Sequence, residues 1–369
     1  MRFLFFTGGW TVGGMETAFL SLMKGLAARG HQPTAIVSGW TDGEVPRLLD
    51  EAGIPHHEVS LGRFYVTNPV FTWHTLRCMP GARRQLRAVA ADVRPDWVIS
   101  PDVQTLLLSA SIFRARRALF LQSPPERLMR HRWAGRLLDR RLDRLLCCSQ
   151  FIADCALSTP VDRAKLAVVL NGVPMPATAS FVQRTPPRLA IVGRIVEQKQ
   201  HMVLLEACAL LKRRGVDCRL AIVGTRGGSF SDAVEARIAA LGLAEQVHWT
   251  GYVADRDRLY GDIDILVAPA VDEPFGLTVA EAGAYGLPVV AARSGAFPEI
   301  VEDDRTGLLF APGNAADLAR NLERLVLDAD LRRRLGSAGR ERVASTFTID
   351  AMTELFLEAT SRRDRQSPP

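Results

Sequence analysis

The chain has 369 residues and a mass of 40.5 kDa, with 47% hydrophobic and 23% charged residues. This composition is typical of a globular protein of about two domains and excludes an intrinsically disordered chain. The net charge is +6, no apolar run is long enough to predict a membrane span, and the short apolar start is expected to be a β-strand rather than a signal peptide.

Apolar runs alternate with helical patterns along the first half of the chain. Strands are expected at Arg2–Phe6, Thr34–Val37, Trp97–Ser100, Ala118–Gln122 and Leu145–Cys148, and a helix at Glu16–Arg29. A Pro-rich stretch at 174–187 then predicts an exposed linker. The alternation resumes with strands at Leu189–Val192, Leu220–Val223, Val247–Trp249, Ile265–Val267 and Val289–Ala291, and helices at Gln200–Arg214 and Ser231–Leu241.

This order predicts an α/β protein with two Rossmann-like, doubly wound domains at 1–173 and 188–345. Residues 346–369 are expected to form a helix around Ile349–Leu357 and a frayed tail. Ligands of such sheets bind beyond the carboxyl ends of the strands, so two domains facing across a cleft are expected. The six cysteines show no C-x-x-C pair or zinc-ligand spacing, which favours free thiols in a cytoplasmic protein.

In the segment 272–288, Glu273 lies where a predicted strand ends, and Glu281 lies within the helix that follows. Backbone N–H groups at the start of the helix Leu277–Tyr285 can hold an anion, and Glu281 can accept hydrogen bonds from a diol. The alternative is two solvated carboxylates near a helix start, where negative charge is favourable in any case.

Two cations follow a predicted strand end in the segment 192–199. Arg194 and Lys199 suit a diphosphate, although a solvated surface pair is the simpler alternative. The P-loop and G-x-G-x-x-G patterns are absent, so a nicotinamide dinucleotide is not supported. Earlier in the chain, Gly13 and Gly14 open a helix after the first strand, where backbone amides can approach a phosphate or sugar; a plain tight turn is the alternative.

Together these segments resemble the family 4 retaining glycosyltransferases of the GT-B fold over nearly the whole chain. This fold implies that the domain 1–173 lies on the acceptor side, that the domain 188–345 binds the nucleotide sugar, and that the helix in 346–369 returns to the first domain. The matching pieces are short, and it is their common order that is specific. They are Gly13-Gly14-Met15-Glu16, Asn171-Gly172-Val173-Pro174, Val192-Gly193-Arg194 with Glu197-Gln198-Lys199, Leu220–Gly224, Gly251-Tyr252-Val253, Glu273 to Glu281, and Gly307-Leu308-Leu309.

The resemblance implies a role for each matching residue. Arg194 and Lys199 would hold the donor diphosphate, and Glu281 the ribose hydroxyls. Glu273 and the backbone of Phe275, Gly276 and Leu277 would hold the donor sugar, Gly14 would lie by the donor phosphate and the acceptor, and Tyr252 and Val253 near the base. Two departures are Gln122, where many relatives carry a histidine that contacts the donor sugar, and Gln200, where the family has glycine.

The implied reaction is transfer of a sugar from a nucleotide-diphosphate donor to a hydroxyl acceptor in polysaccharide, glycolipid or glycoconjugate biosynthesis, with retention of configuration. Cations and helix N-terminal amides can neutralise the leaving group, so no metal cofactor is expected. The D-x-D pattern, a metal-binding signature in a different glycosyltransferase fold, occurs three times, so it is weak evidence here. Asp262–Asp264 leads into a buried strand and is interpreted as structural. Alternatives are a nucleotide-sugar epimerase or hydrolase of the same fold, or a silent sugar-nucleotide-binding protein, which the Gln122 departure favours.

Ten arginines against three acidic residues fall within 114–144. In Arg127–Leu146, apolar residues recur at near-helical spacing, which predicts a basic amphipathic helix. It either docks on the inner face of an anionic membrane or packs on its own sheet as an ordinary helix. A nucleic-acid partner is not expected, because no aromatic or groove-reading pattern accompanies the arginines.

Overall fold

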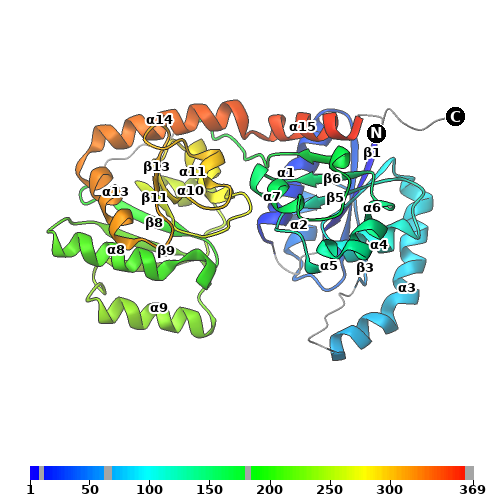
Figure 1. Cartoon of the computed structure of the whole chain (residues 1–369), viewed down its shortest axis with the longest axis horizontal. Helices are drawn as coiled ribbons and strands as arrows, with labels where there is room; N and C mark the ends of the chain where they lie inside the picture. The colour runs from blue at the N-terminus through cyan, green and yellow to red at the C-terminus, as the bar shows by residue number, and fades with distance from the viewer. Residues whose placement is uncertain (8–11, 62–68, 179–183, 362–369) are drawn as a thin grey trace. The chain divides into compact units, whose positions relative to one another are not determined.

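The structure is a computed structural model that describes residues 1–7, 12–61, 69–178 and 184–361. Contacts divide the chain into two units, which Figure 1 shows as strands with helices on both sides. The first unit comprises Met1–Gly172 together with Ile349–Pro369, and the second comprises Val173–Thr348. The chain therefore leaves the first unit once and returns to it at its C-terminal end.

The first unit contains a seven-stranded sheet in which the neighbouring strands run parallel. Every residue of its central strand after Arg2 is buried, as expected for a strand with helices over both faces. In spatial order the strands are β3 (His56–Val59), β2 (Gln32–Ser38), β1 (Arg2–Thr7), β4 (Trp97–Ser100), β5 (Arg116–Leu121), β6 (Arg144–Cys147) and β7 (Leu166–Val168).

The helices of this unit follow its strands. They are α1 (Gly14–Ala28), α2 (Glu44–Glu51), α3 (Pro69–Val93), α4 (Val103–Ala110), α5 (Arg127–Arg130), α6 (Arg132–Asp139), α7 (Gln150–Ala156) and the returning α15 (Ile349–Ser361), with a 3₁₀ turn at Arg163–Lys165.

The second unit repeats the design with a six-stranded parallel sheet. In spatial order its strands are β10 (Val247–Gly251), β9 (Arg219–Val223), β8 (Arg188–Val192), β11 (Ile265–Ala268), β12 (Val289–Ala292) and β13 (Leu308–Phe310). Its helices are α8 (His201–Arg213), α9 (Gly228–Ala240), α10 (Arg256–Gly261), α11 (Leu277–Ala284), α12 (Phe297–Ile300), α13 (Ala315–Leu327) and α14 (Ala329–Thr346), with a 3₁₀ turn at Glu197–Lys199.

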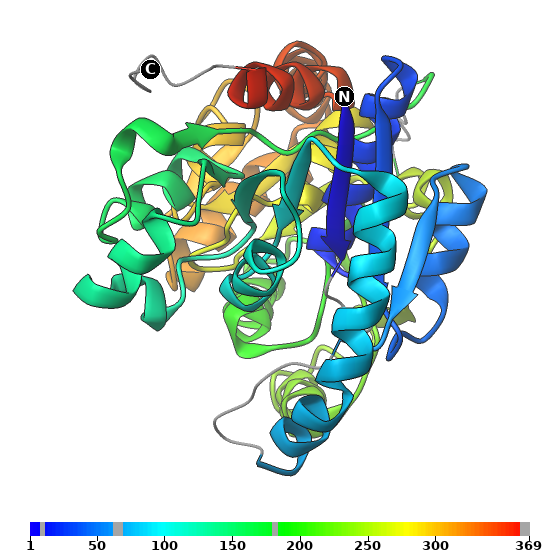
Figure 2. The same cartoon turned by 90° about the vertical axis from the view of Figure 1, so that its right-hand side faces the viewer.

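The helix α15 packs against α1 and the start of β1, as Figure 2 shows in red and dark blue. A Cβ on Gly25 would come within 2.1 Å of Thr353 Oγ1, so the glycine lets the two helices approach closely. The ring of Phe356 meets that of Phe3 edge-on, with centroids 5.3 Å apart. Arg144 Nε donates to the carbonyl of Ala359 at 3.0 Å, so α15 is part of the first unit's core.

The two chain crossings between the units lie next to each other. Val173 N donates to Phe347 O at 2.8 Å, and Val173 pairs with Thr348 in an isolated parallel bridge. The predicted linker 174–187 is fixed at both ends to the second unit. Arg340 Nη2 donates to Pro176 O at 2.8 Å, and Arg184 pairs with Asp264 at 3.2 Å.

One prediction about the basic segment is wrong. Arg127–Leu146 is not a single helix, because the chain turns to an extended conformation at His131 between α5 and α6, and Leu145 lies in β6. Met129 and Leu138 are buried, whereas the side chains of Trp133 and Leu137 are 70% and 46% exposed. Helical periodicity alone does not detect such a break. All six cysteines are free thiols, and Cys147 and Cys148 are buried, as predicted.

Candidate active site

The carboxyl ends of three strands in the second unit are joined by close backbone contacts. Gly193, directly after β8, donates from its amide to Val223 O at 2.9 Å. A Cβ on Gly224 would lie 2.1 Å from the carbonyl of Gly193, so only glycine fits there. Gly224 N in turn donates to Gly251 O at 3.0 Å. These contacts aim the loop 193–199 outward from the sheet edge.

This loop is tied to the segment that follows β11. Val271 N donates to Gln198 O at 3.2 Å, and Gln198 Nε2 donates to Val271 O at 3.3 Å. Lys199 Nζ donates to Glu273 Oε2 at 2.9 Å, and their side chains are only 18% and 16% exposed. Because both charges are largely desolvated, each depends on the other. The structure thus brings Lys199 and Glu273 together as one pair.

Arg194 projects from the same loop and is exposed. Among the residues that the structure describes, no carboxylate forms an ion pair with it. An exposed guanidinium with free donors, in the same loop as Lys199, is suited to bind an incoming anion in a bidentate manner.

The first turn of α11 adds backbone donors. Gly276 precedes the helix with φ of 103°, and a Cβ there would lie 2.7 Å from the ring of Phe297. Phe275 is buried beneath it. The amides of Val279 and Ala280 bond to Gly276 O, whereas Leu277 and Thr278 provide the unpaired first N–H groups that every helix has. These amides attract negative charge.

Glu281 lies in the second turn of α11 and is 8% exposed. Arg256 Nε donates to its Oε1 at 2.7 Å, and Tyr260 OH donates to its Oε2 at 2.7 Å. Burial and the neighbouring Glu281 raise the pKa of Tyr260, so its hydroxyl keeps its proton and acts as a donor. A carboxylate oxygen accepts about two hydrogen bonds, so one position on each oxygen is left for a ligand.

A second pair supports this network. The rings of Tyr260 and Tyr285 stack with centroids 4.9 Å apart, and Tyr285 OH donates to Asp257 Oδ1 at 2.5 Å. Sequence reasoning missed Arg256, Tyr260 and Tyr285. Arg256 and Tyr260 are four residues apart, which is one helical turn, but α10 is too short for such spacing to stand out.

Behind Lys199 lies a buried histidine. His201 is 2% exposed, its ring meets Phe230 edge-on at 6.1 Å, and its Nδ1 has no hydrogen-bond partner among the described residues. Burial, with a smaller effect of Lys199, lowers the pKa of His201 to about 4. At neutral pH it is therefore an uncharged group that supports the loop.

The remaining residues predicted in the second unit also follow its strands. Tyr252 and Val253 come directly after β10, and Tyr252 is 72% exposed. Gln200, at the position where the resemblance implies glycine, takes φ of 54°, which is a left-handed conformation. Asp264 accepts from Arg188 N at 2.8 Å, in agreement with a structural role for Asp262–Asp264.

The predicted residues of the first unit lie beyond β1 and β5. Gly14 is the first residue of α1, and Gly13 N donates to Glu16 Oε2 at 3.0 Å; residues 8–11 of that loop lie outside the described residues. Gln122 exchanges two hydrogen bonds with the buried Asn171, at 3.2 and 2.7 Å. Its amide is thus partly used by the protein itself. His131, a conceivable substitute for the missing histidine, is exposed, and the side chain of His74 is not described.

Two parallel α/β units with these strand-end residues define a GT-B glycosyltransferase. The sequence profile described as "Glycosyltransferase Family 4" matches residues 12–175, and that described as "Glycosyl transferases group 1" matches residues 179–342. The chain belongs to the family 4 glycosyltransferases, and its activity is the transfer of a sugar in glycoconjugate biosynthesis.

Among curated proteins, the chain is 28% identical over 356 residues to the lipopolysaccharide core biosynthesis glycosyltransferase LpsE of Rhizobium meliloti, covering 94% of this chain and 95% of the relative. It is 28% identical to a GDP-mannose-dependent phosphatidylinositol dimannoside mannosyltransferase of Mycobacterium tuberculosis, covering 79% of each. Among solved structures, HepE of Anabaena in complex with UDP and glucose superposes with a TM-score of 0.80 at 19% identity, covering 98% of this chain and 99% of that one.

None of the helices in the described ranges carries an apolar stretch long enough to cross a bilayer. Within the same ranges, no group of three or more His, Cys, Asp or Glu side chains is placed to hold a metal ion.

Proposed function

We propose that the protein is a retaining glycosyltransferase that takes its sugar from a nucleotide-diphosphate donor. The observation that carries this proposal is the convergence of Arg194, the Lys199–Glu273 pair and the first amides of α11 at one sheet edge. This edge offers cations and N–H donors for a diphosphate. The buried Glu281 offers two acceptor positions for a pair of hydroxyls.

The residues suggest a reaction in which the bond between the anomeric carbon and the β-phosphate oxygen breaks. Arg194, Lys199 and the α11 amides neutralise the charge that develops on the leaving diphosphate. The acceptor hydroxyl attacks from the same face, and its proton passes to the departing phosphate oxygen. We propose that this chemistry needs no metal, because fixed positive groups supply the neutralisation.

Within this proposal Glu273 holds the donor sugar through the carboxylate oxygen that Lys199 leaves open, together with the backbone of Phe275, Gly276 and Leu277. In the same proposal, Tyr252 and Val253 lie near the base. The LpsE and mannosyltransferase relatives suggest an acceptor in envelope polysaccharide or glycolipid biosynthesis. Six free thiols favour a reducing compartment, so we place the reaction in the cytoplasm.

The proposal is tested by thermal-shift titration with UDP, GDP, ADP, CDP, TDP and their sugar conjugates, with and without EDTA. A nucleotide that binds the native state raises the melting temperature by mass action. We expect one class of nucleotide to give a shift that EDTA leaves unchanged. Lys199→Ala and Glu281→Ala should each reduce that shift while the protein stays folded; unchanged nucleotide affinity in both variants would overturn the site assignment.

Turnover separates the remaining alternatives. Transfer to an acceptor with retained anomeric configuration, read by NMR of the product, supports the transferase. Hydrolysis or epimerisation that is independent of any acceptor would indicate another enzyme of the same fold. Nucleotide binding without turnover on a broad acceptor panel would indicate a silent binding protein.

We also propose peripheral membrane contact through the exposed apolar side chains of α6. Trp133 and Leu137 lie among the arginines of the basic segment, and such a combination favours an anionic interface. The double variant Trp133→Ser, Leu137→Ser should lose co-sedimentation with phosphatidylglycerol vesicles. Equal sedimentation of variant and wild type would leave α6 with a purely structural role.

A further inference from the structure

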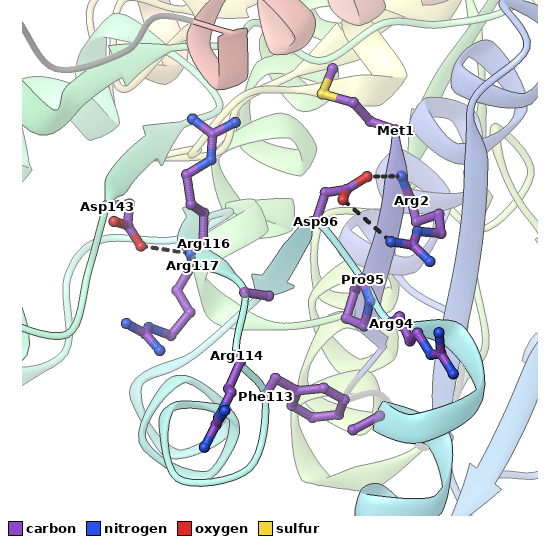
Figure 3. Close-up of a pocket in the computed structure, with 12 residues that line it drawn as sticks. Met1, Arg2, Arg94, Pro95, Asp96, Phe113, Arg114, Arg116, Arg117 and Asp143 are labelled. Atoms are coloured by element: carbon purple, nitrogen blue, oxygen red, sulfur yellow. Dashed lines mark hydrogen bonds and ion pairs between the residues drawn. The ribbon is translucent and has the colours of Figure 1, made fainter.

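A groove of about 930 Å³ opens in the first unit at the amino ends of its central strands. Its walls come from the starts of β1 and β5, the residues before β4 and β6, and the end of α3, as Figure 3 shows. Gly14 and Gln122 follow the carboxyl ends of β1 and β5, at the opposite edge of the same sheet. The groove is therefore separate from the residues assigned to sugar transfer.

Five arginines and two aspartates line this groove, namely Arg2, Arg94, Arg114, Arg116, Arg117, Asp96 and Asp143. The aspartates anchor strand ends. Asp96 Oδ2 accepts from Arg2 N at 2.7 Å, and Asp143 Oδ2 accepts from Arg117 N at 2.8 Å. Asp96 also pairs with the Arg2 side chain at 3.6 Å, and two carboxylates against five guanidinium groups neutralise the groove only in part.

Three guanidinium groups are held by contacts that leave their outer nitrogens available. Arg117 Nε donates to Arg141 O at 2.7 Å, and Arg94 Nε donates to Ala91 O at 3.2 Å. The guanidinium of Arg116 lies 4.4 Å above the ring of the buried Trp97. Over the described ranges of the chain, neither these three nor Arg114 form an ion pair with a carboxylate. Such anchored, unneutralised guanidinium groups bind phosphate well.

The backbone of Arg94 adds an independent observation. It follows the last residue of α3 with φ of 46°, a left-handed conformation in which helices usually end with glycine. A long side chain at such a position is unfavourable by about 1 kcal/mol, and residues of this kind cluster at functional sites. The strained residue is at the same time a groove arginine.

We propose that this groove is a second binding site, for a phosphate-bearing ligand, at the edge of the sheet away from the transfer residues. Figure 3 shows the side chains of Arg116 and Arg117 turned in opposite directions, so one phosphate does not contact all of the arginines, and the ligand carries more than one phosphate or equivalent anionic group. Two sources share this chemistry: a free phosphorylated glycan and the headgroup of an anionic lipid.

The test uses the full-length protein, with sodium tripolyphosphate as the probe in isothermal titration calorimetry. Arg94→Gly removes a groove cation and at the same time relieves the strained backbone, so the variant should melt at a higher temperature and bind tripolyphosphate about tenfold more weakly. The double variant Arg114→Ser, Arg116→Ser should lose a comparable or larger factor. A loss of binding in a more stable protein is not explained by misfolding.

Asp304→Gly is the matched control, because it also replaces a left-handed residue with glycine but lies in the second unit, outside the residues assigned to sugar transfer. It should keep the tripolyphosphate affinity of the groove. Tripolyphosphate can also occupy the proposed donor site, so Arg194→Ala is measured in parallel. If Arg194→Ala abolishes binding while the groove variants bind like wild type, the groove proposal is wrong, and the donor site stands.

The source of the phosphate is then assigned with vesicles of phosphatidylcholine containing 30% phosphatidylglycerol. Vesicle binding that the groove variants lose assigns the groove to a lipid headgroup, whether or not Trp133→Ser, Leu137→Ser also reduces it. Groove-dependent binding of tripolyphosphate without groove-dependent vesicle binding assigns it to a free phosphorylated ligand. Tripolyphosphate and vesicle binding that are both unchanged in the groove variants would reject the site.

Discussion

The side chains around Glu281 show how single residues prepare the candidate active site before any ligand arrives. Each carboxylate oxygen is held by one donor, Arg256 on Oε1 and Tyr260 on Oε2. The carboxylate is therefore fixed in one orientation, although the sequence pattern identified only the glutamate. Its partners belong to a six-residue helix, where local spacing carries little information.

Glu281→Ala should lower the free energy of unfolding by about 1–3 kcal/mol, because the fully buried Tyr260 hydroxyl loses its acceptor. Glu281→Gln keeps an oxygen for that hydroxyl and should be milder. Urea denaturation measures both. Equal stability of Glu281→Ala and wild type would show that Tyr260 finds another partner.

Arg256→Ala should weaken nucleotide binding while leaving the Tyr260 contact intact. Glu281 then keeps one of its two donors and is held less firmly for the proposed ligand hydroxyls. Titration calorimetry with the nucleotide found by thermal shift measures the loss, with the exposed Arg258→Ala, two residues on in the same helix, as control. Tighter binding in Arg256→Ala would mean that the arginine competes with the donor instead.

Gln200 has a left-handed backbone, a conformation that glycine adopts without strain. Gln200→Gly should raise the free energy of unfolding by about 0.5–1 kcal/mol, since relief of the left-handed strain exceeds the added chain entropy. Thermal denaturation checks the sign. A destabilised variant would show that the bond from Gln200 Nε2 to Glu197 O matters more than the strain.

The free energy of unfolding should depend on pH through the ionisation of His201. Its pKa is about 4 in the folded protein, below the ordinary value of 6.5, so below pH 6.5 the unfolded chain binds a proton that the native protein does not. Stability is full above about pH 6.5 and falls toward pH 4 by up to about 1.4 kcal/mol per unit. His201→Gln should flatten this part of the curve, whereas the exposed His248→Gln should not; parallel curves for all three proteins would contradict the assignment.

At the scale of elements, apolar runs in the sequence identify the buried central strands but miss three strands at the sheet edges. The runs at the starts of both halves correspond to β1 and β8, with most of their residues buried. The edge strands β3, β7 and β13 were not predicted. β3 is mainly polar, and β7 and β13 are apolar runs of only three residues, too short to stand out in the sequence. The break between α5 and α6 was also missed, because the apolar residues before and after it follow the same helical spacing.

The close packing of α1 against α15 predicts that Gly25 cannot be replaced without loss of stability. Gly25→Ala places a methyl group within 2.1 Å of Thr353 Oγ1, so α15 must shift, at an expected loss of about 1–3 kcal/mol. Gly81→Ala is the matched control, because it is a helical glycine with nothing within 4 Å, and it should stabilise by about 0.5–1 kcal/mol. Urea denaturation of both variants tests this; equal effects would mean that α15 does not need the close approach.

At the scale of the whole molecule, the order of short motifs predicted more than any of them alone. The ordered set indicated the fold and family, and the profiles, relatives and solved structures confirm both. It could not predict the groove at the amino ends of the first sheet, because the groove combines strand starts that lie far apart in the sequence. Topology, rather than a local motif, brings those arginines together.

The adjacent crossings at Val173 and Thr348 have a consequence for how such a protein can be built. The whole second unit is one uninterrupted stretch of the gene, inserted into a first unit that is complete only when the last helix returns. Its two ends are already joined by a backbone pair, so the stretch can be exchanged as a cassette. A chimaera that takes residues 173–348 from a relative should then inherit that relative's nucleotide choice and keep this chain's acceptor.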